Sequence, residues 1–143
     1  MLYTGSDFYI IDFEGEPART PDERRRLRSP LHYVAGMMRS FHYAAFGVLS
    51  MQLPGAQTRP EDRERLEPWA RWFADCCSRA FYHQYLRSSE GAPYLTGDRD
   101  DWQALLEIHL IEKALYELIY ELDNRPTWAE LPLRGLLLLT ESA

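Results

Sequence analysis

The sequence is poor in the features that mark secreted, membrane-spanning and metal-binding proteins. Its only cysteines, Cys76 and Cys77, are neighbours, and neighbouring side chains on a helix point in different directions. By themselves they predict neither a disulfide framework nor a metal site. Apolar runs such as Leu136–Leu139 are far shorter than the about 20 residues of a membrane span, and the acidic and polar segment 7–16 does not resemble a signal peptide. We expect a cytoplasmic protein with reduced thiols and no membrane partner.

Positive charge is also scarce, and lysine is almost missing. The chain has 16 lysine and arginine residues against 22 acidic residues, with a formal net charge of -6. Such a balance provides no general field that would attract nucleic acid or an anionic membrane, so we expect neither as a partner. Lys113 is the single lysine, which makes its position informative.

What the chain does have is enough apolar material for one domain. Its 143 residues, of which 45% are hydrophobic, predict a single domain over 1–143. Strand-forming residues at 7–13 follow a turn-prone Thr-Gly-Ser, which predicts a hairpin whose second strand is buried and ends near Glu14. We therefore expect a β-hairpin over 1–17 and a helical part over 18–143.

Helix start signals recur along the helical part. Thr20-Pro-Asp-Glu23 is a capping box with proline at the first helical position, and Ser29-Pro30 repeats the order of cap and proline. Pro68 is expected to split or kink its helix, because proline removes a backbone hydrogen bond. The expected helices are a short one after Thr20 and longer ones over 31–51, 58–88, 98–124 and from 127 onward. These elements predict a mainly α fold with a small N-terminal β-hairpin.

Asp12 and Glu14 are the first candidate site residues. In a strand they share one face, about 7 Å apart along the backbone. Such a pair suits Mg²⁺, which binds through one or two carboxylates together with phosphate oxygens. Two other interpretations stay open: surface carboxylates at a solvated strand end, and the acid and base of a glycosidase.

The helix over 102–124 sorts its side chains into two faces with different chemistry. One face is apolar, and we expect it to be core, so that Leu115→Ala should cost about 2–5 kcal/mol of stability. This face consists of Ala104, Ile108, Ile111, Leu115, Leu118, Ile119 and Leu122. The face around Lys113 contains Trp102, Leu106, His109, Tyr116, Glu117, Tyr120 and Asn124.

The face around Lys113 has the residue types of a sugar-binding wall. Aromatic rings stack on the C–H faces of sugars, while charged and amide groups bond sugar hydroxyls. Alternatively, the tyrosines are an amphipathic core edge and Lys113 forms only an i,i+4 pair with Glu117 or His109. Arg125 is expected either to reach back to the acidic flank of this helix or to neutralise its C-terminus. His32, His42 and His83 lack metal-ligand spacing and are predicted to be core-edge residues.

Several co-linear stretches carry a resemblance to a known family. They are Ile11-Asp-Phe-Glu-Gly-Glu-Pro17, Ser29-Pro-Leu31, Val34-Ala-Gly-Met-Met-Arg-Ser-Phe41, Tyr43-Ala-Ala45, Leu66-Glu-Pro-Trp-Ala-Arg-Trp72, Glu112-Lys-Ala-Leu-Tyr-Glu-Leu118, Tyr120-Glu-Leu122 and Asn124-Arg-Pro126. Together they resemble the C-terminal part of bacterial maltokinase, including the kinase region fused to trehalose synthase. The resemblance implies the helical C-lobe of an aminoglycoside-phosphotransferase-like and protein-kinase-like fold.

The resemblance also implies an activity, the transfer of phosphate from ATP to maltose to give maltose 1-phosphate. Asp12 matches the family's metal-binding aspartate, with Glu14 beside it, which implies Mg²⁺ and ATP as cofactors. The implied contacts to maltose or a related α-glucoside are Lys113, Tyr116, Glu117, Tyr120 and Arg125. Tyr120→Ala should accordingly weaken maltose binding and leave the fold nearly intact.

The chain also departs from this family. A phosphoryl-transfer site needs a nucleotide lobe and a catalytic loop with its base, and the eleven residues before Asp12 are too few to contain that loop. We therefore expect no catalytic base here and no activity of the chain alone, only the acceptor and metal half, with a missing N-terminal kinase half or trehalose synthase as partner. The alternative is a non-catalytic helical sugar-binding or protein-interaction module that docks through exposed aromatics such as Trp69, Trp72 and Phe73.

Overall fold

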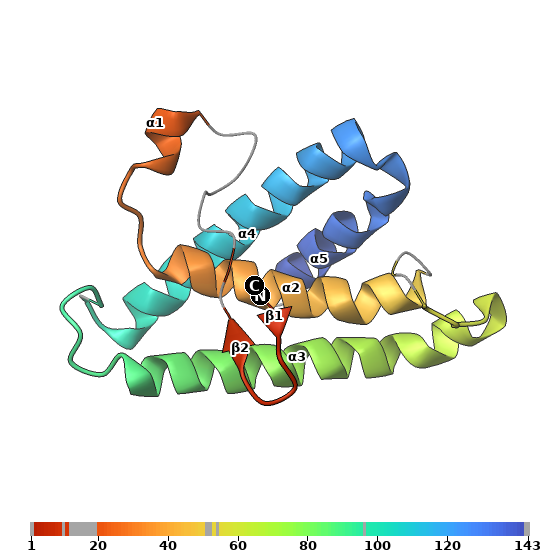
Figure 1. Cartoon of the computed structure of the whole chain (residues 1–143), viewed down its shortest axis with the longest axis horizontal. Helices are drawn as coiled ribbons and strands as arrows, with labels where there is room; N and C mark the ends of the chain where they lie inside the picture. The colour runs from red at the N-terminus through yellow and green to blue at the C-terminus, as the bar shows by residue number, and fades with distance from the viewer. Residues whose placement is uncertain are drawn as a thin grey trace.

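A computed structural model describes residues 2–9, 11, 20–50, 53, 55–95 and 97–141 of the chain. In chain order its elements are β1 Leu2–Tyr3, β2 Phe8–Tyr9, α1 Pro21–Arg24, α2 Leu31–Leu49, a 3-10 turn Pro60–Asp62, α3 Arg63–Ser88, α4 Arg99–Asn124, a 3-10 turn Pro126–Trp128 and α5 Glu130–Glu141. This confirms the expected mainly α fold with a small N-terminal antiparallel sheet (Figure 1). No helix in the described part of the chain is both long and apolar enough to span a membrane.

The hairpin is smaller and more exposed than the sequence predicts. β1 and β2 pair antiparallel with Leu2 opposite Tyr9 and Tyr3 opposite Phe8, and Gly5 turns between them with a φ of 97°. Within the described ranges, the two strands pair only with each other and pack against no helix. Tyr9 is 65% exposed and Ile11 is also exposed, so the expectation of a buried strand is wrong over these residues. The pair Asp12 and Glu14 lies outside the described residues.

Capping boxes start α1 and α4, whereas α2 begins at Leu31 with Pro30 itself as N-cap, one residue later than the Ser29-Pro30 order predicts. The backbone N–H of Glu23 donates to Thr20 Oγ1 at 3.3 Å, and the Glu23 carboxylate accepts from the backbone N–H of Thr20 at 2.9 Å. Asp98 caps α4 in the same way, because its Oδ1 accepts from the N–H groups of Asp100 and Asp101 at 2.9 and 3.0 Å. Both capping arrangements satisfy N–H groups that have no partner inside a helix, which fixes where α1 and α4 begin.

Pro68 does not divide the chain as expected. α3 runs as one helix from Arg63 to Ser88 with Pro68 inside it. The proline stands in the second turn of α3, where it removes a single backbone hydrogen bond. The packing of α3 along α2 stabilises the helix by more than the missing hydrogen bond at Pro68 costs.

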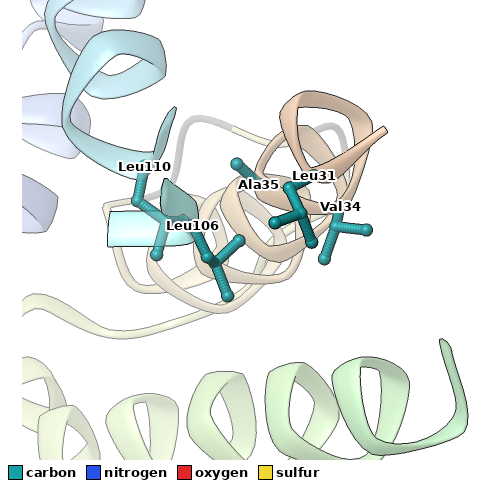
Figure 2. Packing of buried hydrophobic residues seen from close by; sticks show 5 residues of the cluster. All are labelled: Leu31, Val34, Ala35, Leu106 and Leu110. Atoms are coloured by element: carbon teal, nitrogen blue, oxygen red, sulfur yellow. The ribbon is translucent and has the colours of Figure 1, made fainter. Parts of the chain in front are cut away.

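α2 is the central element of the molecule. It lies alongside α3 and also packs against α4 and α5, while α5 returns to contact α4 (Figure 1). Figure 2 shows a hydrophobic cluster where the first half of α2 meets α4, made of Leu31, Val34, Ala35, Leu106 and Leu110. A second cluster around Phe46, Ala70 and Leu131 joins the other end of α2 to α3 and α5. Between the two clusters α2 buries polar residues, Arg39 and His42.

α4 turns a different face inward from the one that its sequence pattern predicts. Its buried residues are Leu106, Leu110, Ala114 and Glu121, which lie between the Lys113 face and the apolar face, about 20–100° from Lys113 at about 100° per residue. Of the seven residues expected to be core, Leu118 is half-buried and the other six are exposed. Leu115, for example, is 47% exposed. The prediction that this apolar face is core is therefore wrong. The loss of about 2–5 kcal/mol expected for Leu115→Ala, which assumed a buried leucine, no longer applies.

Candidate functional site

Four of the five predicted sugar-site residues lie together along one edge of α4. Lys113 Nζ is 5.1 Å from the ring centroid of Tyr116, and the nearly parallel rings of Tyr116 and Tyr120 have centroids 6.5 Å apart. Arg125 follows, with its Cζ 5.8 Å from the Tyr120 centroid. Because residues three and four apart are neighbours on a helix, the sequence spacing alone brings the first three together.

The array extends to one residue that the sequence interpretation missed. Arg125 ends α4 in a non-helical conformation, and the 3-10 turn Pro126–Trp128 doubles back so that Arg125 Cζ lies 4.2 Å from the ring centroid of Trp128. The only sequence signal was the nearness of a tryptophan to the end of the helix. We call Lys113, Tyr116, Tyr120, Arg125 and Trp128 the tyrosine array.

Arg125 is held by a buried carboxylate. Its Nε and Nη2 donate to Glu121 at 2.9 and 2.7 Å, a two-pronged contact to a residue that is only 2% exposed. The Tyr43 hydroxyl of α2 donates to the same carboxylate at 3.4 Å. Arg125 thus reaches back to the acidic flank of α4, the first of the two positions expected for it.

The fifth predicted residue, Glu117, faces α2 instead of the array. Arg39 Nε donates to Glu117 Oε2 at 2.8 Å, and Arg39 Nη2 is 2.8 Å from the same oxygen. Burial raises the pKa of Tyr43 above its ordinary value, and the neighbouring carboxylates Glu117 and Glu121 raise this pKa further. The α2–α4 interface therefore holds two carboxylates, two guanidinium groups and a neutral phenol.

The array has the chemistry of a surface for polar, ring-shaped ligands. Tyr120 is 36% exposed, and Lys113 and Tyr116 are half-buried, so one edge of the array stays open to solvent. Tyrosine rings stack on C–H faces, while the ammonium group of Lys113 and the guanidinium of Arg125 donate hydrogen bonds to hydroxyl or phosphate oxygens. The carboxylate of Glu121 fixes the orientation of Arg125 before any ligand arrives.

A separate cavity of about 510 Å³ opens between α2, α3 and α5, and none of the five predicted residues lines it. Its walls include Arg39, His42, Trp72, Asp75 and Arg79. Burial lowers the pKa of His42 to about 3, and the positive charges of Arg39 and Arg134 contribute to the lowering. His42 is therefore neutral near pH 7, as expected for a histidine of the core and not for a surface residue.

Three residues from two helices form the one group of possible metal ligands within the described ranges. His32 of α2 lies beside His109 and Glu112 of α4, and each offers a ligand atom within 4.8 Å of the other two. The sequence predicts His32 at a core edge, with no link to α4. The His109-x-x-Glu112 spacing was a readable signal, since residues three apart share a helix face, but His32 is 77 positions away from His109 and has no such signal.

No family model matches the chain.

Proposed function

We propose that this chain is the acceptor-binding half of a maltokinase-like phosphotransferase. In this role it binds maltose or a related α-glucoside on the tyrosine array and presents the sugar hydroxyl to a phosphate donor held elsewhere. The observation that supports the proposal is the unbroken sequence of stacking contacts from Lys113 through Tyr116 and Tyr120 to Arg125.

The residues of the array have distinct parts in this proposal. Tyr116 and Tyr120 supply ring faces on which the sugar stacks. Lys113 and Arg125 flank them and bond hydroxyl oxygens. Glu117 acts through Arg39 as a positioning residue for α4, because its carboxylate is already engaged at the α2 interface.

The residues that we propose to bind the phosphate donor through a metal ion, Asp12 and Glu14, lie outside the described residues. Asp12 and Glu14 offer carboxylate oxygens, which are the ligands that Mg²⁺ prefers. An ion bound there with ATP would neutralise phosphate charge during transfer, and the nucleotide lobe and catalytic loop would come from a second polypeptide segment. The chain alone is therefore proposed to bind sugar without phosphorylating it.

The proposal is tested by titrating maltose into the full chain and following the tyrosine ring signals by NMR. We expect saturable shifts with a Kd of about 1–10 mM, weak because only one wall of the site is present. Tyr120→Ala should weaken binding by about two- to tenfold, since stacking on an aromatic ring contributes about 0.5–1.5 kcal/mol. Tyr33→Ala is the matched control, because Tyr33 is an exposed tyrosine on α2 and not a member of the array.

Two results would contradict the sugar site. One is the absence of saturable shifts in the ring signals of Tyr116 and Tyr120. The other is a Tyr120→Ala variant that binds maltose like the parent chain and melts as early as a core variant such as Leu131→Ala. In that case the array is a structural edge of the helix.

A second candidate, a non-catalytic helical interaction module, is favoured by one specific observation. α4 leaves a row of large apolar side chains exposed, namely Ile108, Ile111, Leu115, Ile119 and Leu122. Trp69 and Trp72 of α3 are exposed too, as expected for a docking surface. Rows of this kind mark contact surfaces more often than solvated faces. A sharply monomeric chain in sedimentation velocity that binds no apolar dye would count against this module.

A further inference from the structure

We infer that His32, His109 and Glu112 form a binding site for a divalent transition-metal ion of the zinc class, separate from the carboxylates Asp12 and Glu14. The three side chains offer two imidazoles and one carboxylate, a ligand set that zinc accepts and that Mg²⁺ does not favour. Three protein ligands leave a fourth position for water or for a ligand atom.

The three ligand atoms are already close to the spacing that a metal ion requires. They lie within 4.8 Å of one another, and the rings of His32 and His109 meet edge to face with centroids 5.5 Å apart. Tetrahedral zinc with bonds of about 2.0–2.1 Å places its ligand atoms about 3.3 Å apart. The ligand atoms must therefore approach one another by at most about 1.5 Å to hold the ion.

His109 carries a nitrogen suited to the ion. Its side chain is 12% exposed, and its Nδ1 is 3.2 Å from Glu112 Oε2. Nδ1 is thus the His109 nitrogen that faces Glu112, and it is the nitrogen placed to bind an ion together with that carboxylate.

The hydrophobic cluster of Figure 2 holds the two ligand-bearing helices in register. Leu31 precedes His32 on α2, and Leu110 follows His109 on α4; both leucines belong to that cluster. The backbone of each histidine is thus anchored by an adjacent buried side chain. A site supported in this way is preorganised, so less order must be gained when the ion binds.

Arg28 supports the carboxylate ligand from outside. Its Nη1 donates to Glu112 Oε1 at 3.2 Å, while Oε2 of the same carboxylate faces His109. Hydrogen bonds from an outer residue to a ligating carboxylate are a regular feature of metal sites, because they fix its orientation. The Arg28 contact therefore leaves one oxygen of Glu112 directed at the histidines.

The experiment is a Co²⁺ titration of the full chain after treatment with a chelator, followed by visible absorption. We expect one equivalent of Co²⁺ to bind with the strong visible bands of a four-coordinate ion, and Zn²⁺ to displace it, because zinc binds the same ligands more tightly. A chain that shows no saturable binding, or only the weak spectrum of a six-coordinate ion, would overturn the inference.

Variants locate the ion. His32→Gln and Glu112→Gln should each weaken Co²⁺ binding by at least about 10–100-fold, with far-UV circular dichroism confirming that both variants are folded. His83→Gln is the matched control, since His83 is an exposed histidine on α3, and it should bind like the parent chain.

The adjacent cysteines provide the decisive comparison. The thiols of Cys76 and Cys77 also bind zinc-class ions, so the double variant Cys76→Ser/Cys77→Ser should keep the Co²⁺ spectrum and affinity unchanged. Loss of binding in this double variant, or full binding by both His32→Gln and Glu112→Gln, would place the ion elsewhere and overturn the inference.

Discussion

Replacing Arg39 by methionine tests whether the buried ion pair between α2 and α4 holds the two helices together. Arg39 is 3% exposed, and its guanidinium lies 2.8 Å from a carboxylate oxygen of Glu117. Methionine keeps an unbranched, apolar side chain but is about two atoms shorter than arginine, and it removes the guanidinium and its charge. Glu117 would then stay in an interface that already contains Glu121, whose charge Arg125 balances.

The size of the effect follows from how little water reaches the pair. Side-chain exposure is 4% for Arg39 and 14% for Glu117, so little solvent contacts the pair. Removing one member of a buried pair costs about 3–5 kcal/mol, because the other charge is left uncompensated. Against a typical total stability of about 5–15 kcal/mol, Arg39→Met should remove about a fifth or more of the free energy of unfolding.

Urea unfolding followed by circular dichroism measures this loss, and a double-mutant cycle separates its parts. Arg39→Met/Glu117→Leu should recover stability to within about 1 kcal/mol of the parent chain, because an apolar pair avoids the burial of charge. Arg79→Met breaks a solvent-exposed pair with Asp75 on α3 and should have no measurable effect. The reasoning is refuted if Arg39→Met matches the Arg79→Met control, or if the double variant is less stable than Arg39→Met.

Three further predictions concern the same core. Gly135→Ala should lower the melting temperature by several degrees in thermal scans, because a Cβ at this position would come 2.7 Å from Arg39 Cζ. An unchanged melting temperature would show that the Arg39 guanidinium moves aside freely. Leu131→Ala should lower the free energy of unfolding by about 2–5 kcal/mol in urea unfolding, and Leu115→Ala should lower it clearly less, because Leu131 is 1% and Leu115 47% exposed. Equal losses would mean that the apolar side chains of α4 around Leu115 are buried in solution. The pKa of His42 is about 3 in the folded chain, below the ordinary 6.5, so the unfolded chain binds the proton first as the pH falls. The free energy of unfolding should therefore fall by about 1.4 kcal/mol per pH unit between about pH 6.5 and pH 3. In urea unfolding at several pH values, His42→Phe should remove most of this pH dependence of the free energy of unfolding. An unchanged pH dependence would show that His42 is not its cause.

The helix boundaries could be predicted from the sequence because capping is a local interaction. The Thr20 capping box needs only residues three positions apart, and it formed as expected. The structure adds a second box of the same kind at Asp98, where α4 begins. Of the two effects expected of Pro68, a split or a kink, the split does not occur, since the packing of α3 along α2 is a tertiary effect that the neighbouring residues do not reveal.

The orientation of α4 could not be predicted, because periodicity shows that an apolar face exists without showing what covers it. Which face of α4 is buried depends on contacts with residues far away in the sequence. Arg39 pairs with Glu117 and Tyr43 with Glu121, each 78 positions apart. The array itself was predictable, since Lys113, Tyr116 and Tyr120 depend only on helical spacing.

The single lysine gives this protein an unusual chemical handle. Lys113 is its only side-chain amine, and its Nζ lies over the ring of Tyr116 at the head of the tyrosine array. Any amine-directed reagent, whether a fluorophore, an isotope-labelled methyl donor or a cross-linker, can therefore attach to one side chain only, apart from the backbone amino group. A methylated Lys113 keeps its charge and reports through one resonance on whatever approaches the array. The arginine-rich composition thus leaves the candidate site with a built-in, singly addressable probe.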